Sequence, residues 1–226
     1  MTINASIEVR MTSKRLPGKV LMPIMGKPVL ELLIERVKRS QYIDKIIIAT
    51  TTNREDDPVQ ILSHQLGVEC FRGSEDDVLG RVFSTHKKYN TSIVVELTGD
   101  NPLIEPSLID YSILSYLYSD CDYVTTSLTP FFPKGQAVQV FSFELLEYLN
   151  QYALTQEDRE HVTPHIYKND NTYKVLSLTG SERHYAPDMR QTLDTKEDFE
   201  RISKVFQALY DTDPDFDISK AIEILK

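Results

Sequence analysis

Continuous apolar runs alternate with amphipathic stretches through the first half of the chain. Residues 45–50 (KIIIAT) form a short apolar run of the kind found in strands that are covered on both faces of a parallel sheet. Residues 29–39 instead carry apolar side chains close to helical spacing. This alternation predicts βαβ units and a parallel sheet. The expected strands are 5–9, 45–50, 68–71, 92–97 and 122–126, and the expected helices are 29–39, 108–118, one opened by Pro58 and one opened by a capping box at residues 74–77 (SEDD).

The second half of the chain is less regular. It begins with a loop at residues 129–135 (TPFFPKG) that is rich in residues unfavourable to helices and strands. We find no repeat or linker, so a single domain of the α/β class is expected over residues 1–226. The expected strands are 137–141, 173–178 and 191–193, and the expected helices are 143–152, 157–167, with Pro164 inside or at its end, and 196–210.

The chain is acidic overall, with a formal net charge of −9, which argues against nucleic-acid binding because a phosphate backbone attracts a basic surface. It has no apolar run of membrane-spanning length, no secretory signal pattern and only two cysteines. We therefore expect a cytoplasmic protein that binds neither nucleic acid nor membranes. One short N-terminal stretch is nevertheless basic and indicates a small anionic ligand. Its cations are Arg10, Lys14, Arg15, Lys19 and Lys27.

The basic residues 9–19 (VRMTSKRLPGK) follow the first expected strand. Ligands of open α/β sheets bind beyond the carboxyl ends of the strands. Four cations, the hydroxyls of Thr12 and Ser13 and a turn at Pro17 and Gly18 suit a triphosphate. The stretch matches neither the phosphate loop that ends in Gly-Lys-Ser/Thr nor GxGxxG, which disfavours ATPase and dehydrogenase functions. The alternative interpretation is a solvated run of charge.

Two aspartates stand at the ends of expected strands. Asp100 lies in residues 98–102 (TGDNP), where a carboxylate can hold a divalent cation against phosphate oxygens. The alternative for Asp100 is a simple turn. Asp194 follows the expected strand 191–193 and precedes a helix, so its alternative role is that of a turn or capping residue.

His161 and His165 lie four residues apart, at helical spacing. Two such histidines could hold a metal, but the HExxH arrangement is absent because Val162 follows His161. A structural role or contact with a second substrate fits better. Together with Lys134 and Arg183, these histidines enrich the second half in possible contacts to an anionic acceptor.

Six segments, in order over nearly the whole chain, carry a family resemblance. They are 10–21 (RMTSKRLPGKVL), 25–30 (MGKPVL), 71–79 (FRGSEDDVL), 98–103 (TGDNPL), 159–164 (REHVTP) and 193–199 (LDTKEDF). Together they resemble the cytidylyltransferase superfamily, which includes the acylneuraminate and 3-deoxy-manno-octulosonate cytidylyltransferases. The most similar branch is the spore-coat polysaccharide biosynthesis protein F type. Each motif is modest by itself, and the specificity comes from their shared order.

The resemblance implies a three-layer α/β/α, Rossmann-like nucleotidyltransferase fold with a mostly parallel sheet and a small acceptor and dimerisation subregion at about 130–187. The implied reaction transfers CMP from CTP to an acidic sugar or to a phosphorylated or phosphonate small molecule, with release of pyrophosphate. Surface polysaccharide or glycan biosynthesis is the implied setting. The resemblance also implies a magnesium cofactor and a homodimer.

Roles for individual residues also come from the resemblance, with direct attack of an acceptor oxygen on the α-phosphorus as the implied mechanism. The implied phosphate-binding residues are Arg10, Ser13, Arg15 and Lys19. The residues implied to lie near the base and ribose are Arg72 and Ser74. The implied magnesium ligands are Asp100 and Asp194. The residues implied to carry the chemistry are Lys19, Arg15 and Asp100.

Three positions depart from the family pattern. Thr12 stands where relatives usually have Gly or Ala, and it narrows the space for close approach of the backbone to phosphate. Ala137 and Gln139 stand where the most similar branch usually carries two acids, in a stretch expected to face the acceptor. Two alternatives stay open: a guanylyl- or uridylyltransferase that acts on a sugar phosphate, and a non-catalytic nucleotide-binding protein.

Overall fold

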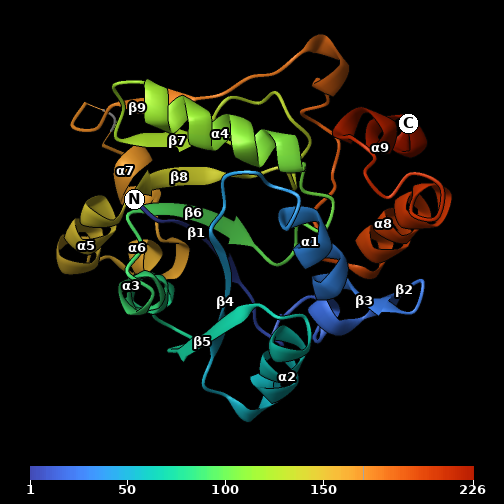
Figure 1. The fold of residues 1–226 in the computed structure, drawn as a ribbon, viewed down its shortest axis with the longest axis horizontal. Coiled ribbons are helices and arrows are strands. Elements are labelled where there is room, and N and C mark those ends of the chain that lie inside the picture. Colours follow the sequence, from blue (N-terminus) through green and yellow to red (C-terminus); the bar gives the residue numbers. More distant parts are fainter. Residues whose placement is uncertain (170) are drawn as a thin grey trace.

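The computed structural model describes residues 1–169 and 171–226. Within them, a seven-stranded sheet of order β5-β4-β1-β6-β8-β7-β9 crosses the molecule, with helices on both faces (Figure 1). This is the mostly parallel α/β architecture that the sequence predicts. The strands of the sheet are β1 (Ile3–Glu8), β4 (Lys45–Thr51), β5 (Glu69–Gly73), β6 (Ile93–Thr98), β7 (Tyr123–Thr125), β8 (Gln139–Ser142) and β9 (Val175–Ser177).

Strand β1 lies at the centre of the parallel part of the sheet. It pairs in parallel with β4 on one side and β6 on the other, and β4 pairs in parallel with β5. These strands end at the same edge of the sheet, so the loops that follow β1 and β6 meet there. Strand β8 is antiparallel to both β6 and β7, since it follows β7 through a loop rather than through the helical crossover that a parallel pair requires.

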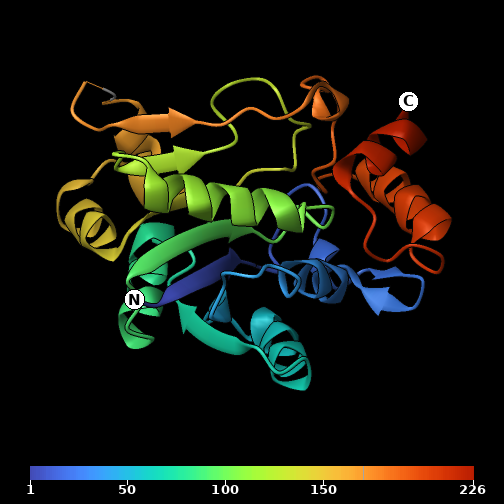
Figure 2. The same ribbon diagram turned by 45° about the horizontal axis from the view of Figure 1, so that its top comes forward.

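Helices cover both faces of the sheet (Figures 1 and 2). One apolar cluster joins β1, β4 and β6 to α1, α2 and α4, and a second joins β6, β7 and β8 to α3, α5, α7 and Val162, the residue after α6, on the opposite face. The helices of the two faces are α1 (Val29–Val37), α2 (Asp57–Gln65) and α4 (Pro106–Tyr118), and α3 (Val78–Lys88), α5 (Phe143–Tyr152), α6 (Gln156–His161) and α7 (Pro164–Tyr167). Among the described helices, none has the length and apolar content needed to cross a membrane.

The C-terminal helices form a third apolar cluster with the segment before α1. This segment folds into a short antiparallel hairpin that the sequence analysis does not predict, because two-residue strands carry no usable pattern. The remaining elements are the hairpin strands β2 (Pro23–Ile24) and β3 (Lys27–Pro28), the helices α8 (Lys196–Leu209) and α9 (Ile218–Leu225), and the 3-10 turns η1 (Lys19–Leu21), η2 (Arg54–Asp56) and η3 (Glu182–His184).

Two elements expected from the sequence are wrong. The helix at 157–167 is broken in two, since Val162 adopts a φ of 63° and α7 restarts at Pro164, which has no N–H to continue a helix. Residues 191–193 form no ladder with any described strand. Instead, the N–H of Leu193 donates to the carbonyl of Asp100 at 2.7 Å, so this segment crosses the loops at the sheet edge.

Candidate active site

The loop after β1 returns to the sheet and places Lys19 at its edge. Gly18 adopts a φ of 72°, a conformation that a side chain disfavours. The Gly18 N–H donates to the carbonyl of Met11 at 2.9 Å and closes the loop. Lys19 begins η1 directly afterwards and is only 8% exposed. A buried ammonium group is costly unless acceptors surround it, so its partners define the site.

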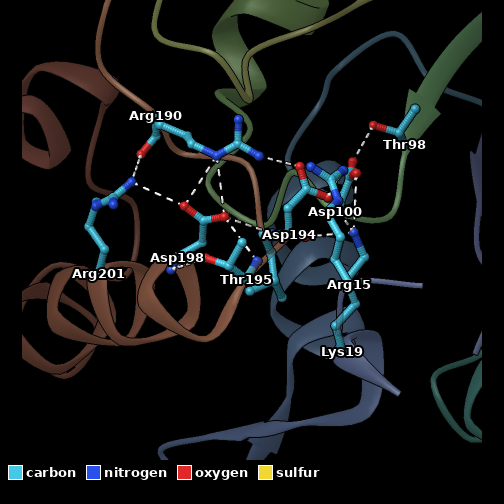
Figure 3. Close-up of polar contacts among 10 residues, drawn as sticks. Arg15, Lys19, Thr98, Asp100, Arg190, Asp194, Thr195, Asp198 and Arg201 are labelled. Carbon is cyan, nitrogen blue, oxygen red and sulfur yellow. Dashed lines mark hydrogen bonds and ion pairs between the residues drawn. The ribbon is translucent and has the colours of Figure 1, made fainter. Parts of the chain in front are cut away.

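The Nζ atom of Lys19 contacts two distant parts of the chain (Figure 3). It donates to the carbonyl of Leu193 at 2.6 Å and to Oδ1 of Asp194 at 3.0 Å, and it lies 3.4 Å from Oδ2 of Asp100. Arg15, from the same loop, lies 2.7 Å from Oδ1 of Asp194. Lys19 therefore contacts both predicted metal ligands, and Arg15 contacts one of them.

A tight turn after β6 fixes Asp100. The hydroxyl of Thr98 donates to Oδ1 of Asp100 at 2.7 Å. Between them, Gly99 packs so closely on the end of β1 that an added Cβ would lie 2.8 Å from a methyl group of Val9 and 3.0 Å from the carbonyl oxygen of Glu8. Only glycine lets this turn lie against the start of the basic loop.

The start of α8 holds Asp194 in place. Thr195 caps this helix, and Asp198 completes a capping box in which it accepts the N–H of Thr195 at 3.0 Å. Asp198 also accepts the N–H of Asp194 at 3.1 Å. Arg190 donates to Oδ2 of Asp194 and, through Nε, to Asp198 at 3.2 Å. Between them, Arg190 and Asp198 orient the Asp194 carboxylate (Figure 3).

Arg190 and Asp198 are not among the site residues predicted from the sequence. The signal that could have found Asp198 is its position three residues after Thr195, which is capping-box spacing. Burial by itself would raise the pKa of Asp198, but the backbone N–H of Asp194 and the guanidinium of Arg190 hold that pKa below its usual range. Asp198 is therefore ionised near neutral pH, as its pairing with Arg190 requires.

A cavity of about 420 Å³ lies at this edge of the sheet. Its walls combine cations with the carboxylates of Asp100 and Asp194, which suits a polyphosphate bound with a divalent cation. The predicted site residues that line it are Arg10, Ser13, Arg15, Lys19, Asp100 and Asp194. Further polar groups that line it are Glu8, Lys14, Arg81, Thr98, Glu160 and His161.

Arg72 and Ser74 are not among the described residues that line this cavity. The guanidinium of Arg72 donates to the carbonyls of Thr51 and Asn53 at 2.7 and 2.6 Å, and it pairs with Asp57 at 2.6 Å. Ser74 lines an adjacent cavity of about 520 Å³, and Arg81 borders both cavities. Roles for Arg72 and Ser74 near the base and ribose stay predictions.

Two of the residues that depart from the family pattern form internal hydrogen bonds. Thr12 donates through its hydroxyl to Glu75 and so ties the basic loop to the segment before α3. Gln139 accepts hydrogen bonds from the hydroxyls of Tyr123 and Thr163. Gln139 of β8 is therefore a hydrogen-bond acceptor that links its strand to β7 and to the residue before α7.

Within the described residues, no group of three or more His, Cys, Asp and Glu side chains is placed to hold a metal ion. Within that part of the chain, His161 and His165 belong to no such group. His165 lies 3.8 Å from Asp158 and packs edge-on against Tyr173. A metal ion at the sheet edge would be coordinated by two carboxylates and by oxygen atoms of bound substrates.

Comparisons with known proteins cover nearly the whole chain. The sequence model of the cytidylyltransferase family matches residues 5–223. An uncharacterized protein of Methanocaldococcus jannaschii is 42% identical over 199 residues, which cover 88% of this chain and 81% of that protein. The spore coat polysaccharide biosynthesis protein SpsF of Bacillus subtilis is 35% identical over 97% of this chain and 92% of its own length. The solved structure of a cytidylyltransferase from Leptospira borgpetersenii is similar with a TM-score of 0.94 and 30% identity, covering 100% of this chain and 94% of that chain.

Proposed function

This chain belongs to the cytidylyltransferase family of enzymes, and we propose that it transfers CMP from CTP to a hydroxyl of an acidic sugar or of a phosphorylated or phosphonate small molecule. Pyrophosphate is the second product, and synthesis of a surface polysaccharide or glycan is the setting. The observation that carries the proposal is the meeting of Lys19, Asp100 and Asp194 at one cavity, although Lys19 and Asp194 lie 175 positions apart.

The cations of the basic loop bind the triphosphate. Lys19 and Arg15 both pair with Asp194, so phosphate oxygens compete with this carboxylate for the two cations. An acceptor oxygen attacks the α-phosphorus, and pyrophosphate leaves. Phosphoryl-type transfers depend chiefly on positioning and on stabilisation of developing charge. A site built from cations and carboxylates, with no nucleophilic side chain assigned a role, is consistent with such a reaction.

The side chains at the sheet edge fit magnesium. In proteins, this ion is usually held by one or two carboxylates together with waters and substrate phosphate oxygens. Oδ2 of Asp100 and Oδ1 of Asp194 both face the ammonium of Lys19, so the two carboxylates already lie around one positive charge. We assign Asp100 and Asp194 as the magnesium-holding residues. When bound, the ion supplies neutralisation of negative charge on the phosphate oxygens.

Two side chains away from the basic loop, both able to contact an anion, support an anionic acceptor. Arg81 of α3 and His161 at the end of α6 both line the cavity, and Arg81 is only 4% exposed. Of the four residues expected to contact the acceptor, His161 is the one that lines this cavity in the described structure. His165, Lys134 and Arg183 lie elsewhere.

We expect CTP with magnesium to stabilise the protein more than ATP, GTP or UTP does. A ligand at about 100 times its dissociation constant raises the free energy of unfolding by ~2.7 kcal/mol, which a thermal-unfolding measurement detects. Each triphosphate is compared at the same concentration, with and without magnesium. A larger shift with GTP or UTP would show that the base is misassigned and would favour a guanylyl- or uridylyltransferase.

A homodimer formed through about residues 130–187 is also expected. The sequence offers four aromatic side chains there for apolar contact, namely Phe131, Phe132, Tyr167 and Tyr173. Of these, Phe132 is buried in the core of the chain and is not available for such contact. Exposed aromatic and aliphatic side chains in this region are Tyr148, Tyr152, Leu154 and Tyr185. Light scattering at micromolar concentration should give twice the monomer mass of 26.0 kDa, and a stable monomer would exclude the dimer.

A further inference from the structure

The layer between β1, β6 and α3 is unusually polar for the interior of a sheet. Register places Asn4, Ser6 and Glu8 of β1 on one face, together with Glu96 of β6. Six side chains of this layer each have a buried polar atom without a hydrogen-bond partner among the described residues, whereas most buried polar groups are paired. They are Asn4, Ser6, Glu8, Arg81, His86 and Glu96. Burial of polar groups without hydrogen-bond partners costs stability. Natural proteins are expected to accept such a cost at functional sites.

This polar layer opens into the active-site cavity at Glu8. Glu8 is the last residue of β1, and its side chain lines the cavity that Lys19 and Asp100 also line. Its Oε1 atom is buried and has no partner among the described residues. Glu96 lies deeper in the layer, is 2% exposed, and shares a hydrogen bond with Glu8. A carboxyl pair therefore joins the cavity to the interior of the fold.

Arg81 is built into the same layer. Its side chain fits because residue 73 is glycine, where an added Cβ would lie 2.9 Å from Cγ of Arg81. Its guanidinium donates to the carbonyl of Ser74, while its Nε atom is buried and has no partner among the described residues. A buried cation near Glu8 stabilises the ionised carboxylate.

Several charged and titratable groups lie near Glu8 or share its cavity. Those that act on it directly are Glu96 of β6, Asp100 of the following turn and Arg81 of α3. Asp56 of η2 and Arg10 lie near Arg81, His86 of α3 belongs to the same polar layer, and Lys19, Glu160 and His161 line the same cavity as Glu8. Burial raises the pKa of Glu8 to about 7, while Arg81 and the hydrogen bond from Glu96 oppose that rise. Burial, together with the charge of Glu8, raises the pKa of Glu96 well above its usual range.

We propose that Glu8 accepts the proton of the acceptor hydroxyl, and that Glu96 is the positioning residue that hydrogen-bonds to it. This inference rests on the proposed function. The acceptor oxygen forms a bond to the α-phosphorus, the bond from that phosphorus to the bridging oxygen of pyrophosphate breaks, and pyrophosphate leaves with the electron pair. The hydroxyl proton passes to the Glu8 carboxylate. A base that ionises near the working pH is best suited to this step.

The pH dependence of pyrophosphate release tests the role of Glu8. The assay uses CTP, magnesium and a panel of 2-keto-3-deoxy acids, sugar phosphates and phosphonates. The wild-type kcat should rise with pH through about 7 as Glu8 ionises. Glu8→Gln preserves size but cannot accept the proton, so kcat should fall by about 10²- to 10⁴-fold and lose that pH dependence. Glu69→Gln, at an exposed glutamate of β5, is the matched control and should behave as the wild type does.

Variants of Glu96 separate positioning from structure. Glu96→Gln keeps a hydrogen-bond donor for Glu8, so the pH profile should stay where it is. Glu96→Leu removes the donor that lowers the pKa of Glu8, so the rise in kcat should move to higher pH. A profile that is the same in the wild type, Glu8→Gln and Glu96→Leu would overturn the proposal, even if the rates differ.

Unfolding measurements test the pair without any acceptor. The pKa of Glu8 is raised from 4.5 to about 7, so its contribution to stability is fully present below about pH 4.5 and is lost as pH rises through about 7. Glu8→Gln should therefore gain stability relative to the wild type between pH 5 and pH 8.5. If no acceptor releases pyrophosphate, the proposed function fails, and this comparison still decides about Glu8. Without the relative gain, Glu8 is not poised to exchange a proton near neutral pH and the inference is wrong.

Discussion

Asp194→Asn and Asp100→Asn are each expected to reduce the rate of pyrophosphate release by at least about 10²–10³-fold, the scale of losing one preorganised group that stabilises transition-state charge. Asp194 contacts Lys19 and Arg15, and Asp100 contacts the same ammonium. Each variant removes one of the two carboxylates assigned to magnesium. The double variant should be little worse than either single variant, because groups that act as a unit give non-additive effects.

An exposed aspartate elsewhere in the chain provides a control for the two aspartate variants. Asp188 is exposed and lies six residues before Asp194, so Asp188→Asn should leave both the rate and the stability unchanged. Titration of each variant with magnesium, followed by the thermal shift with CTP, separates loss of the metal from loss of the fold. Near-normal turnover by Asp194→Asn would show that Asp194 has only a structural role at the start of α8 and does not hold the metal.

Lys19→Ala is expected to weaken CTP binding by roughly 1.5–3 kcal/mol, the usual contribution of a hydrogen bond to a charged group. That corresponds to about a 10- to 150-fold rise in the dissociation constant. Lys19 also joins the basic loop to Leu193 and Asp194, so the free energy of unfolding should fall as well. Arg15→Ala should weaken CTP binding with a smaller effect on stability, because Arg15 is largely exposed.

Lys27 is the matched control for these cations. It belongs to the same basic stretch of the sequence, but it pairs with Glu31 and Glu35 of α1 rather than with the cavity. Lys27→Ala should therefore keep the wild-type affinity for CTP. Unchanged affinity for CTP in both Lys19→Ala and Arg15→Ala would support the alternative interpretation, in which the loop is a solvated run of charge.

Local patterns in the sequence predict the part of the site that depends on single segments. The basic loop follows β1, and Asp100 follows β6 as the apolar runs indicate. The approach of Asp194 is also predicted, but the expected reason is wrong. Asp194 does not end a strand, and the N–H of Leu193 instead bonds to the carbonyl of Asp100. A bond of this kind between loops has no periodic signature in the sequence.

Residues whose contacts come from several helices and strands cannot be recognised from the sequence alone. Arg190 belongs to no expected element, and its partners Asp194 and Asp198 come into place only when α8 docks. Glu8 and Glu96 interrupt apolar strands, and each could equally have been an exposed position. Their shared face becomes visible only when β1 and β6 pair in register. Tertiary contact, rather than local propensity, decides these positions.

The most direct test of the central claim is pyrophosphate release from CTP and magnesium in the presence of the acceptor panel, with the products analysed by mass spectrometry. We expect release that depends on an anionic acceptor and is matched one to one by a CMP conjugate of that acceptor. GTP and UTP should give much less. Release with neutral sugars alone would contradict the assigned acceptor class. Absence of release with every acceptor and triphosphate, despite CTP binding, would contradict the assigned reaction.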